Sequence, residues 1–406
     1  MTALPVMRSA NLLLSAAFLL SSVAVQACGG EEPPPVTPAP PPTNTAPPPP
    51  TTEPKPEPPP APKKTLTELQ GENLETALKG LNGHDPKMFA SVYAENGVIN
   101  VAGLNEVNGR AAVEQNMAEW FETFKDVKLG FSRVWTKGDT MVLEWVINGK
   151  HHGELFGVKG TEQQIGHYGL SVVTFNQDGK VVRENRYGEL GAVMQQVGGA
   201  AKAKPRPIPE VPKEPQFITA KNTPEEDKQI EVAKTLLTSL ESKKEADFLG
   251  AITDDMEHDG LFHLETSKGK EGAKKFFKQF TTAFPDAKFE VTKAVAIGDY
   301  VIAESTLKAT QKGQLGTIAP TKRPVALHLV DVLKIKDGKI ARAWTYQNSL
   351  ELQHQLGLFD VKAGNVPASQ AQPAKPAGDA KPADTKKSEP KAADPKKPAE
   401  TGGQKK

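Results

Sequence analysis

The sequence has almost no cysteine, almost no net charge and no long hydrophobic segment. Cys28 is the only cysteine among 406 residues, so no disulfide can form within the chain. Fifty Lys and Arg against 49 Asp and Glu leave a net charge of +1, which argues against nucleic acid as a partner. The uncharged run from Leu12 to Val25 is too short to span a bilayer unaided.

The first residues have the pattern of an export signal, because Arg8 precedes the apolar run. Val25-Gln26-Ala27 then leads directly to Cys28, an arrangement that resembles the lipobox of bacterial lipoproteins. The resemblance implies a signal peptide over residues 1–27 and diacylation of Cys28, which anchors the protein to membrane lipid in the cell envelope. Gly29 after the cysteine favours the outer membrane. A soluble exported protein cleaved near Ala27 is the alternative.

Two segments have compositions that cannot bury a core. Seventeen prolines lie between Pro33 and Pro62, so we expect residues 28–64 to be a disordered stalk with extended polyproline character. Residues 363–406 consist mainly of Ala, Pro and Lys, and we expect a disordered tail. The excess of Lys in this tail suits either an envelope polymer as a partner or simple solvation.

Between these segments the sequence is a repeat. Gly138-Asp139 recurs 160 residues later as Gly298-Asp299, and Asp178-Gly179 recurs 159 residues later as Asp337-Gly338. Other pairs follow in the same order, which indicates duplicated domains. We place domain 1 at residues 65–200, a linker at 201–219 and domain 2 at 220–362.

Each copy has helical patterns first and strand patterns later. Thr65 and Glu68 form a capping box at the start of the first copy, and Thr223-Pro224 begins the second. Long alternating segments follow, punctuated by Gly-Asp and Asp-Gly turns. The pattern predicts an α+β fold with about three helices on a curved antiparallel sheet in each domain.

The punctuation carries a family resemblance. Domain 2 contains, in order, Phe284-Pro285-Asp286, Gly298-Asp299, Pro320-Thr321, Asp337-Gly338-Lys339-Ile340, Trp344 and Gln355-Leu356-Gly357. Domain 1 keeps the stretch from Gly153 to Gly157. Both copies resemble the SnoaL-like polyketide cyclases (ester cyclases) of the nuclear transport factor 2-like superfamily, whose domains are conical. The resemblance implies a ring-closing aldol condensation that uses a carboxylate in the cone and neither metal nor cofactor.

The resemblance points to unequal copies. The carboxylate of the family follows the Trp of the last strand by four residues, which in domain 2 is Asn348, an amide that cannot serve as a base. The matching residue of domain 1 is Glu189, and His152 and His167 could line the same cone. These three residues are the candidate catalytic set. Either histidine could instead occupy an ordinary surface or edge position.

A second set could hold a ligand. Trp120 and Tyr187 in domain 1 could surround Glu189, while His328 in domain 2 could face an aromatic wall. That wall consists of Trp344, Tyr346 and Asn348, which share a strand face by alternation. Simple core filling is the alternative for Trp344. No spacing of carboxylates or histidines predicts a metal site.

Three functions remain open because this fold hosts all of them. The protein could bind a small apolar molecule in a conical pocket, act as a cyclase-type acid/base enzyme through Glu189 in domain 1, or serve as a scaffold in the envelope. Sequence patterns do not identify the ligand.

Overall fold

The computed structural model describes residues 64–199, 207–260 and 266–359, which belong to one compact unit spanning residues 62–406. The predicted signal peptide, Cys28, almost all of the stalk and the tail lie outside the described residues. Within the described part of the chain, no helix is both long enough and apolar enough to cross a membrane.

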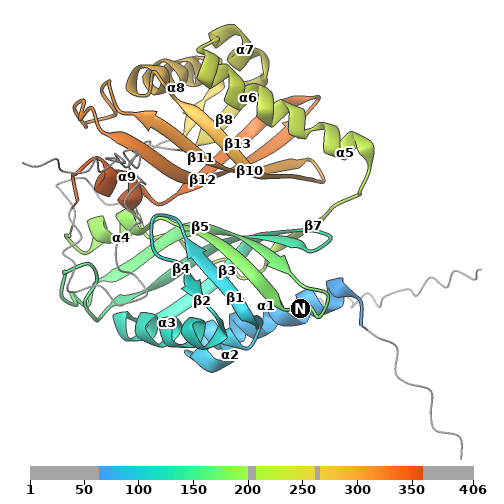
Figure 1. Ribbon diagram of the computed structural model, residues 1–406, viewed down its shortest axis with the longest axis vertical. Coiled ribbons are helices and arrows are strands. Elements are labelled where there is room, and N and C mark those ends of the chain that lie inside the picture. The colour runs from blue at the N-terminus through green and yellow to red at the C-terminus, as the bar shows by residue number, and fades with distance from the viewer. Residues whose placement is uncertain (1–63, 200–206, 261–265, 360–406) are drawn as a thin grey trace, which may run out of the picture. The chain divides into compact units, whose positions relative to one another are not determined.

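Domain 1 places its helices on one face of a seven-stranded sheet (Figure 1). Its elements are α1 (Leu66–Asn82), α2 (Pro86–Ala90), β1 (Tyr93–Val101), β2 (Val107–Asn108), α3 (Arg110–Thr123), β3 (Phe124–Lys137), β4 (Thr140–His151), β5 (Gln164–Phe175), β6 (Val181–Gly188) and α4 (Leu190–Gln196). The seventh strand, β7 (Gln216–Thr219), comes from the predicted linker and pairs with β3.

Domain 2 repeats this order with a six-stranded sheet (Figure 1). Its elements are α5 (Pro224–Lys228), α6 (Ile230–Ser242), α7 (Glu245–Gly250), β8 (Ile252–Asp259), β9 (Ser267–Lys268), α8 (Gly269–Ala283), β10 (Lys288–Ile297), β11 (Tyr300–Thr310), β12 (Pro324–Lys336), β13 (Lys339–Gln347) and α9 (Ser349–Gln355). The α+β class and the duplication are therefore as the sequence predicts.

Each sheet is mixed, whereas the sequence pattern predicted an antiparallel sheet. The strand orders are β2-β1-β6-β5-β4-β3-β7 and β10-β11-β12-β13-β8-β9. The first long strand of each domain lies beside the last one and runs parallel to it, as β1 with β6 and β8 with β13. Parallel neighbours need a long crossover, and here the intervening helix and strands supply it.

Local sequence signals account for several boundaries. Thr65 and Glu68 form the predicted capping box of α1, and Thr223 caps α5 with Pro224 at its first position. Asp337 and Gly338 are the two residues between β12 and β13, and both have positive φ. This is the backbone that a tight two-residue hairpin requires.

Phenylalanines fill the space between the helices and the sheet of domain 2. Phe280 of α8 is stacked with Phe276 and Phe289 at ring centroid distances of 6.0 and 5.9 Å, and it contacts Phe284 at 5.6 Å. Burying one such side chain contributes about 1.5–3 kcal/mol. The interior of domain 2 is therefore held mainly by aromatic packing.

One chain of polar side chains interrupts this core. Asp331 of β12 accepts a hydrogen bond of 2.6 Å from the Thr345 hydroxyl of β13, and that hydroxyl lies 3.1 Å from Nε2 of His258. Burial raises the pKa of Asp331 to about 6, although the bond from Thr345 partly opposes the rise. Asp331 thus lacks the cation that usually accompanies a buried carboxylate.

The outer faces of the two sheets share a third hydrophobic core. Trp135, Val142 and Leu170 from domain 1 belong to it together with Tyr300, Ile302 and Val332 from domain 2. Arg133 lies over the Trp344 ring with its guanidinium carbon 3.9 Å from the ring centroid. Each sheet is consequently buried on both faces.

Two reciprocal hydrogen bonds cross this core. The Tyr187 hydroxyl donates to Glu304 at 2.8 Å, and the Tyr346 hydroxyl donates to Glu144. The two glutamates are 160 residues apart and the two tyrosines 159 apart, so both bonds join equivalent positions. Such an arrangement is typical of a two-fold interface, here built within one chain.

We expect the stability of the protein to depend on pH through Asp331. Its folded-state pKa of about 6 lies above the ordinary value of 3.8, so the stabilisation is complete below about pH 4 and is lost as the pH rises through about 6. A shift of this size corresponds to up to about 3 kcal/mol. Urea denaturation of Asp331→Asn should lose this pH dependence, whereas exposed Asp299→Asn should keep it. Retention of the full dependence in Asp331→Asn would assign it to another group.

We also expect Tyr187→Phe to destabilise the chain more than Tyr346→Phe. After Tyr187→Phe, Glu304 keeps the Asn185 amide, whereas after Tyr346→Phe, Glu144 keeps Arg133 and Ser132. Hydrogen bonds to charged groups contribute about 1.5–3 kcal/mol. Chemical denaturation followed by circular dichroism measures both losses. Tyr168→Phe at a tyrosine that is 53% exposed is the matched control, and equal unfolding energies in all three variants would contradict the interpretation.

Candidate functional site

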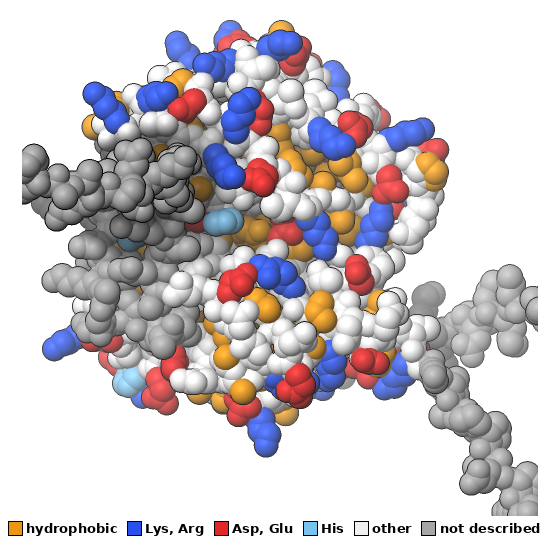
Figure 2. Space-filling view, in the orientation of Figure 1, with side chains coloured by type: hydrophobic (Ala, Val, Ile, Leu, Met, Phe, Trp, Pro, Cys, Tyr) orange, Lys and Arg blue, Asp and Glu red, His pale blue; other side chains and the backbone are white. Residues whose placement is uncertain are grey.

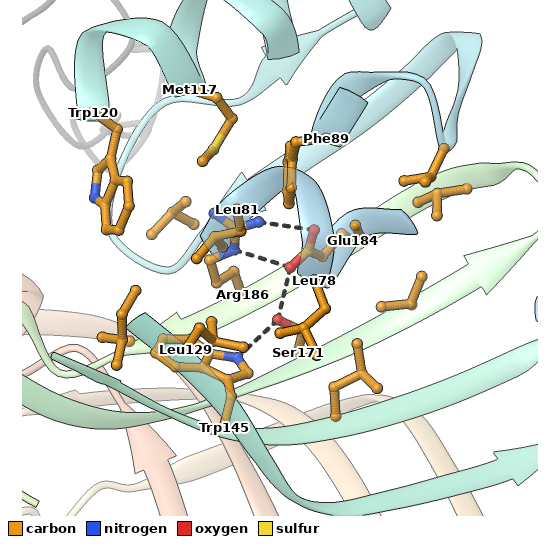
Figure 3. Close-up of a pocket in the computed structure, with 18 of the residues that line it drawn as sticks. Leu78, Leu81, Phe89, Met117, Trp120, Leu129, Trp145, Ser171, Glu184 and Arg186 are labelled. Carbon is orange, nitrogen blue, oxygen red and sulfur yellow. Dashed lines mark hydrogen bonds and ion pairs between the residues drawn. The ribbon is translucent and has the colours of Figure 1, made fainter. Parts of the chain in front are cut away.

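Domain 1 contains a cavity of about 160 Å³ between its helices and its sheet. Helices α1 to α3 contribute mostly apolar residues, which include Leu78, Leu81, Phe89, Met117 and Trp120. Strands β3 to β6 supply the opposite wall, with Trp145 the largest side chain (Figure 3). An apolar cavity of about 150 Å³ is large enough to hold benzene.

A polar cluster lies in this apolar wall. Glu184 of β6 accepts hydrogen bonds from Ser171 at 2.7 Å, from Nε and Nη2 of Arg186 at 2.9 Å each, and from the Tyr93 hydroxyl. The indole nitrogen of Trp145 donates to Ser171 at 3.1 Å, so the chain of bonds runs from the sheet to the guanidinium (Figure 3). The four residues bonded in series therefore hold one another in place.

The alternation of β6 explains how Glu184 and Arg186 come together. Residues two apart on a strand point to the same face, and these two point toward the helices. Tyr93 opens β1, which lies beside β6, and Ser171 of β5 pairs directly with Arg186. Three neighbouring strands thus supply the cluster.

The cluster has a defined charge at neutral pH. Burial alone would raise the pKa of Glu184, but the charge of Arg186 and its hydrogen bonds outweigh burial and lower it. Burial opposes the charge of Arg186 too, but Glu184 raises the pKa of the guanidinium above its usual range. The pair is therefore ionised on both sides and has no net charge.

His167 lines the same cavity as a neutral side chain. Burial lowers its pKa to about 4, and the Tyr168 carbonyl only partly opposes the change. Nδ1 lies 3.0 Å from that carbonyl oxygen and 3.2 Å from the backbone nitrogen of Glu189. The ring meets Trp145 edge to face at 5.4 Å. His167 is therefore uncharged at neutral pH and anchored at the wall.

The equivalent positions of domain 2 carry different side chains. Ala343 and Thr345 occupy the places of Glu184 and Arg186, and Asp331 occupies that of Ser171. On the opposite wall, Phe276 replaces Asn116 and Phe289 replaces Leu129. The added rings fill the space that remains hollow in domain 1.

Of the residues predicted from the sequence, Trp120 and His167 line the cavity. Glu189 does not, because β6 ends at Gly188 and the strand alternation stops before it. Glu189 caps α4, and its carboxylate accepts hydrogen bonds from Ala192 and from Ser349 of domain 2. His152 lies at the surface, with Nδ1 2.5 Å from Glu162.

The remaining predicted residues lie away from the cavity. Tyr187, Trp344 and Tyr346 occupy the shared core between the sheets. Asn348 caps α9 and donates to the Ala102 carbonyl at 3.0 Å. His328 is half exposed and pairs with Glu351 at 2.7 Å; the hydrogen bond to Glu351 raises its pKa. The structure does not bring these four residues and His328 together as one ligand wall.

Sequence reasoning missed Glu184, Arg186, Ser171, Tyr93 and Trp145. It took the aromatic face of the last strand as the inner one, yet that face meets the other domain. The signal that could have found the site is the unusual alternation of Glu184 and Arg186 on a strand otherwise flanked by apolar neighbours. Charged residues at interior spacing need partners, and an acid two residues from an arginine supplies one.

In residues 64–199, 207–260 and 266–359, no group of three His, Cys, Asp or Glu side chains is placed to hold a metal ion. The face of the molecule in Figure 2 carries acidic and basic side chains interspersed with one another. The cavity of domain 1 is therefore the candidate site with the best-defined geometry.

Comparisons with solved structures find single-domain proteins. A protein described as a SnoaL-like polyketide cyclase from Jannaschia sp. CCS1 is 19% identical, with a TM-score of 0.30, and the match covers 32% of this chain and 92% of that one. A protein described as a polyketide cyclase from Bacillus cereus ATCC 10987 is 23% identical (TM-score 0.28; 32% and 82% covered). A ketosteroid isomerase-like protein from Catenulispora acidiphila DSM 44928, in complex with trimethylamine, is 16% identical (TM-score 0.28; 33% and 98% covered).

No curated protein matches the chain. The sequence model of the SnoaL-like polyketide cyclase family, however, matches residues 72–197 and again residues 230–356. The two matches cover most of the chain and coincide with the two structural repeats. The chain therefore belongs to the SnoaL-like polyketide cyclase family, whose domain it contains twice.

Proposed function

We propose that domain 1 binds a small, mainly apolar molecule in its cavity, and that domain 2 is the scaffold that covers the outer face of the domain 1 sheet. The observation that carries the proposal is the hollow, apolar cavity of about 160 Å³ with one polar cluster in its wall. Ligand pockets commonly combine an apolar lining with few, well-placed polar groups.

The state of Glu184 favours binding over acid/base chemistry. A carboxylate has about four lone-pair sites, and Glu184 already accepts four hydrogen bonds. Its pKa is lowered, whereas a general base works best with a pKa near the operating pH. Glu184 is thus suited to orienting Arg186 and poorly suited to taking a proton from a ligand.

The contrast with domain 2 supports the division of roles. Stacked phenylalanines occupy its interior, and its outer sheet face contributes half of the shared core. A domain with these properties stabilises its neighbour without offering a comparable hollow. The scaffold role of domain 2 follows from this packing.

We also propose that the protein is held at the cell envelope, probable sorting residue Gly29 included, by acylation of Cys28. The support is the apolar run ending in Val25-Gln26-Ala27 directly before the single cysteine. More than one acyl chain gives stable anchoring, because each buried CH₂ contributes about 0.8 kcal/mol. The cavity would then face molecules that reach the envelope.

Filling the cavity with the residues of domain 2 should abolish binding. The variant Ala77→Leu/Asn116→Phe/Leu129→Phe copies Leu236, Phe276 and Phe289 into domain 1. Calorimetric titration with ethylbenzene should show one site in the wild type and roughly tenfold or greater weakening in the variant. Ala118→Phe, on the exposed side of α3, is the control and should bind normally. Unchanged binding in the filled, folded variant would exclude this cavity as the site.

The anchoring proposal has its own test. Cys28→Ser should release the protein from membranes, because the thiol is the acceptor of the lipid. Metabolic labelling with a fatty-acid analogue followed by membrane fractionation measures both properties. A wild-type protein that takes up no label and stays in the soluble fraction would refute the anchor.

A further inference from the structure

The hydrogen-bonding capacity left in the cavity wall restricts the kind of ligand. Ser171 donates its hydroxyl proton to Glu184, and so does Tyr93. The lone pairs of Glu184 are all used. The carboxylate therefore offers a ligand no further acceptor site, and these two hydroxyl groups offer it no proton.

Arg186 is the exception in this cluster. A guanidinium has five N–H groups, and Glu184 accepts two of them, one from Nε and one from Nη2. The Tyr93 oxygen is close enough to accept a third. Two N–H groups then remain without an acceptor among the described residues, on a side chain that lines the cavity.

Charge decides which acceptor suits these donors. Glu184 and Arg186 neutralise each other, and His167 is uncharged at neutral pH because burial lowers its pKa to about 4. A carboxylate ligand would bury an additional negative charge near Glu184 without a cation of its own, which is costly. A neutral carbonyl oxygen accepts the same hydrogen bonds without that cost.

We infer that the ligand of domain 1 is an apolar molecule with a neutral carbonyl group, such as a ketone or an ester, whose oxygen accepts hydrogen bonds from Arg186. This inference rests on the proposed binding function of the cavity. Glu184 is the positioning residue, since it fixes the guanidinium with its free N–H groups toward the ligand. Trp120 and Met117 then contact the apolar body of the ligand.

Three probes of similar size separate the alternatives: acetophenone, ethylbenzene and benzoate. Each is titrated into the intact protein at pH 7 by calorimetry. Acetophenone should bind roughly tenfold more tightly than ethylbenzene, because only the ketone can use the free donors of Arg186. Benzoate should bind more weakly than acetophenone. Equal binding of acetophenone and ethylbenzene would overturn the inference while leaving the binding function intact, and tighter binding of benzoate would replace the carbonyl with an anion.

Failure of the binding function itself looks different. If neither acetophenone nor ethylbenzene binds to the wild-type protein, the cavity is not a ligand site and the inference falls with it. Any binding that persists in the cavity-filled variant Ala77→Leu/Asn116→Phe/Leu129→Phe takes place elsewhere. These two results concern the proposed function, whereas the ratio between the probes concerns the carbonyl.

A double substitution removes the donors without leaving an unpaired buried charge. Glu184→Leu/Arg186→Met replaces the ion pair with apolar side chains, a change that buried pairs often tolerate. Ethylbenzene should still bind, and the roughly tenfold preference for acetophenone should disappear. Arg183→Met removes a cation from the same strand, where it pairs with Glu106 outside the cavity, and should leave the preference unchanged. A preference that survives the double substitution would exclude Arg186 as the donor.

A measurement on the wild type covers the case in which the double variant does not fold. Acetophenone labelled with ¹³C at the carbonyl is bound to the intact protein, and its ¹³C resonance is compared with that in an apolar solvent. Hydrogen bonding to a guanidinium should move the resonance downfield. A resonance equal to that in the apolar solvent would show that the carbonyl meets no donor and would overturn the inference.

Discussion

The burial of both faces of each sheet is the constraint on which the rest of the structure depends. On the inner faces the sheets meet their own helices, and on the outer faces they share the core that contains Trp135 and Tyr300. The bonds from Tyr187 to Glu304 and from Tyr346 to Glu144 lie within this shared core, where water cannot replace them. An unmatched glutamate there would carry the desolvation penalty of a buried charge. The interface is consequently specific in register as well as large in apolar content.

Duplication within one chain allowed the two interiors to differ while the interface stayed two-fold. The tyrosines and glutamates that cross the shared core occupy equivalent positions, but the interior positions do not match. Domain 2 has Phe276 and Phe289 where domain 1 has Asn116 and Leu129, so aromatic packing stabilises one interior and a hollow remains in the other. A hollow lowers stability because its wall loses packing contacts. A well-packed partner domain on the other face of the sheet offsets that loss.

The two buried carboxylates illustrate how the same fold produces different electrostatics. Glu184 has Arg186 beside it and is ionised, whereas Asp331 has a hydroxyl beside it and titrates near pH 6. Both lie on the inner face, on adjacent strands of equivalent sheets. The difference comes from one neighbour, since position 186 of domain 1 is an arginine and the equivalent position 345 of domain 2 is a threonine. Local substitution on an unchanged scaffold is enough to move a carboxylate between a binding role and a titrating one.

Much of the fold could be predicted from the sequence, and the site could not. The repeat, the order of helices and strands, the cap at Thr65 and the turn at Asp337-Gly338 follow from local physical chemistry, because capping and turn geometry act over a few residues. Alternation along the last strand correctly separates Glu184 and Arg186 from Tyr187, but it does not say which set faces the helices. An aromatic residue usually marks the inner face; here the outer face is equally buried, so Tyr187 and Trp344 point to the other domain. The sequence by itself determined two α+β domains and their elements. Only the tertiary structure decided which strand face became the cavity, because that choice depends on what each face packs against and not on the strand alone.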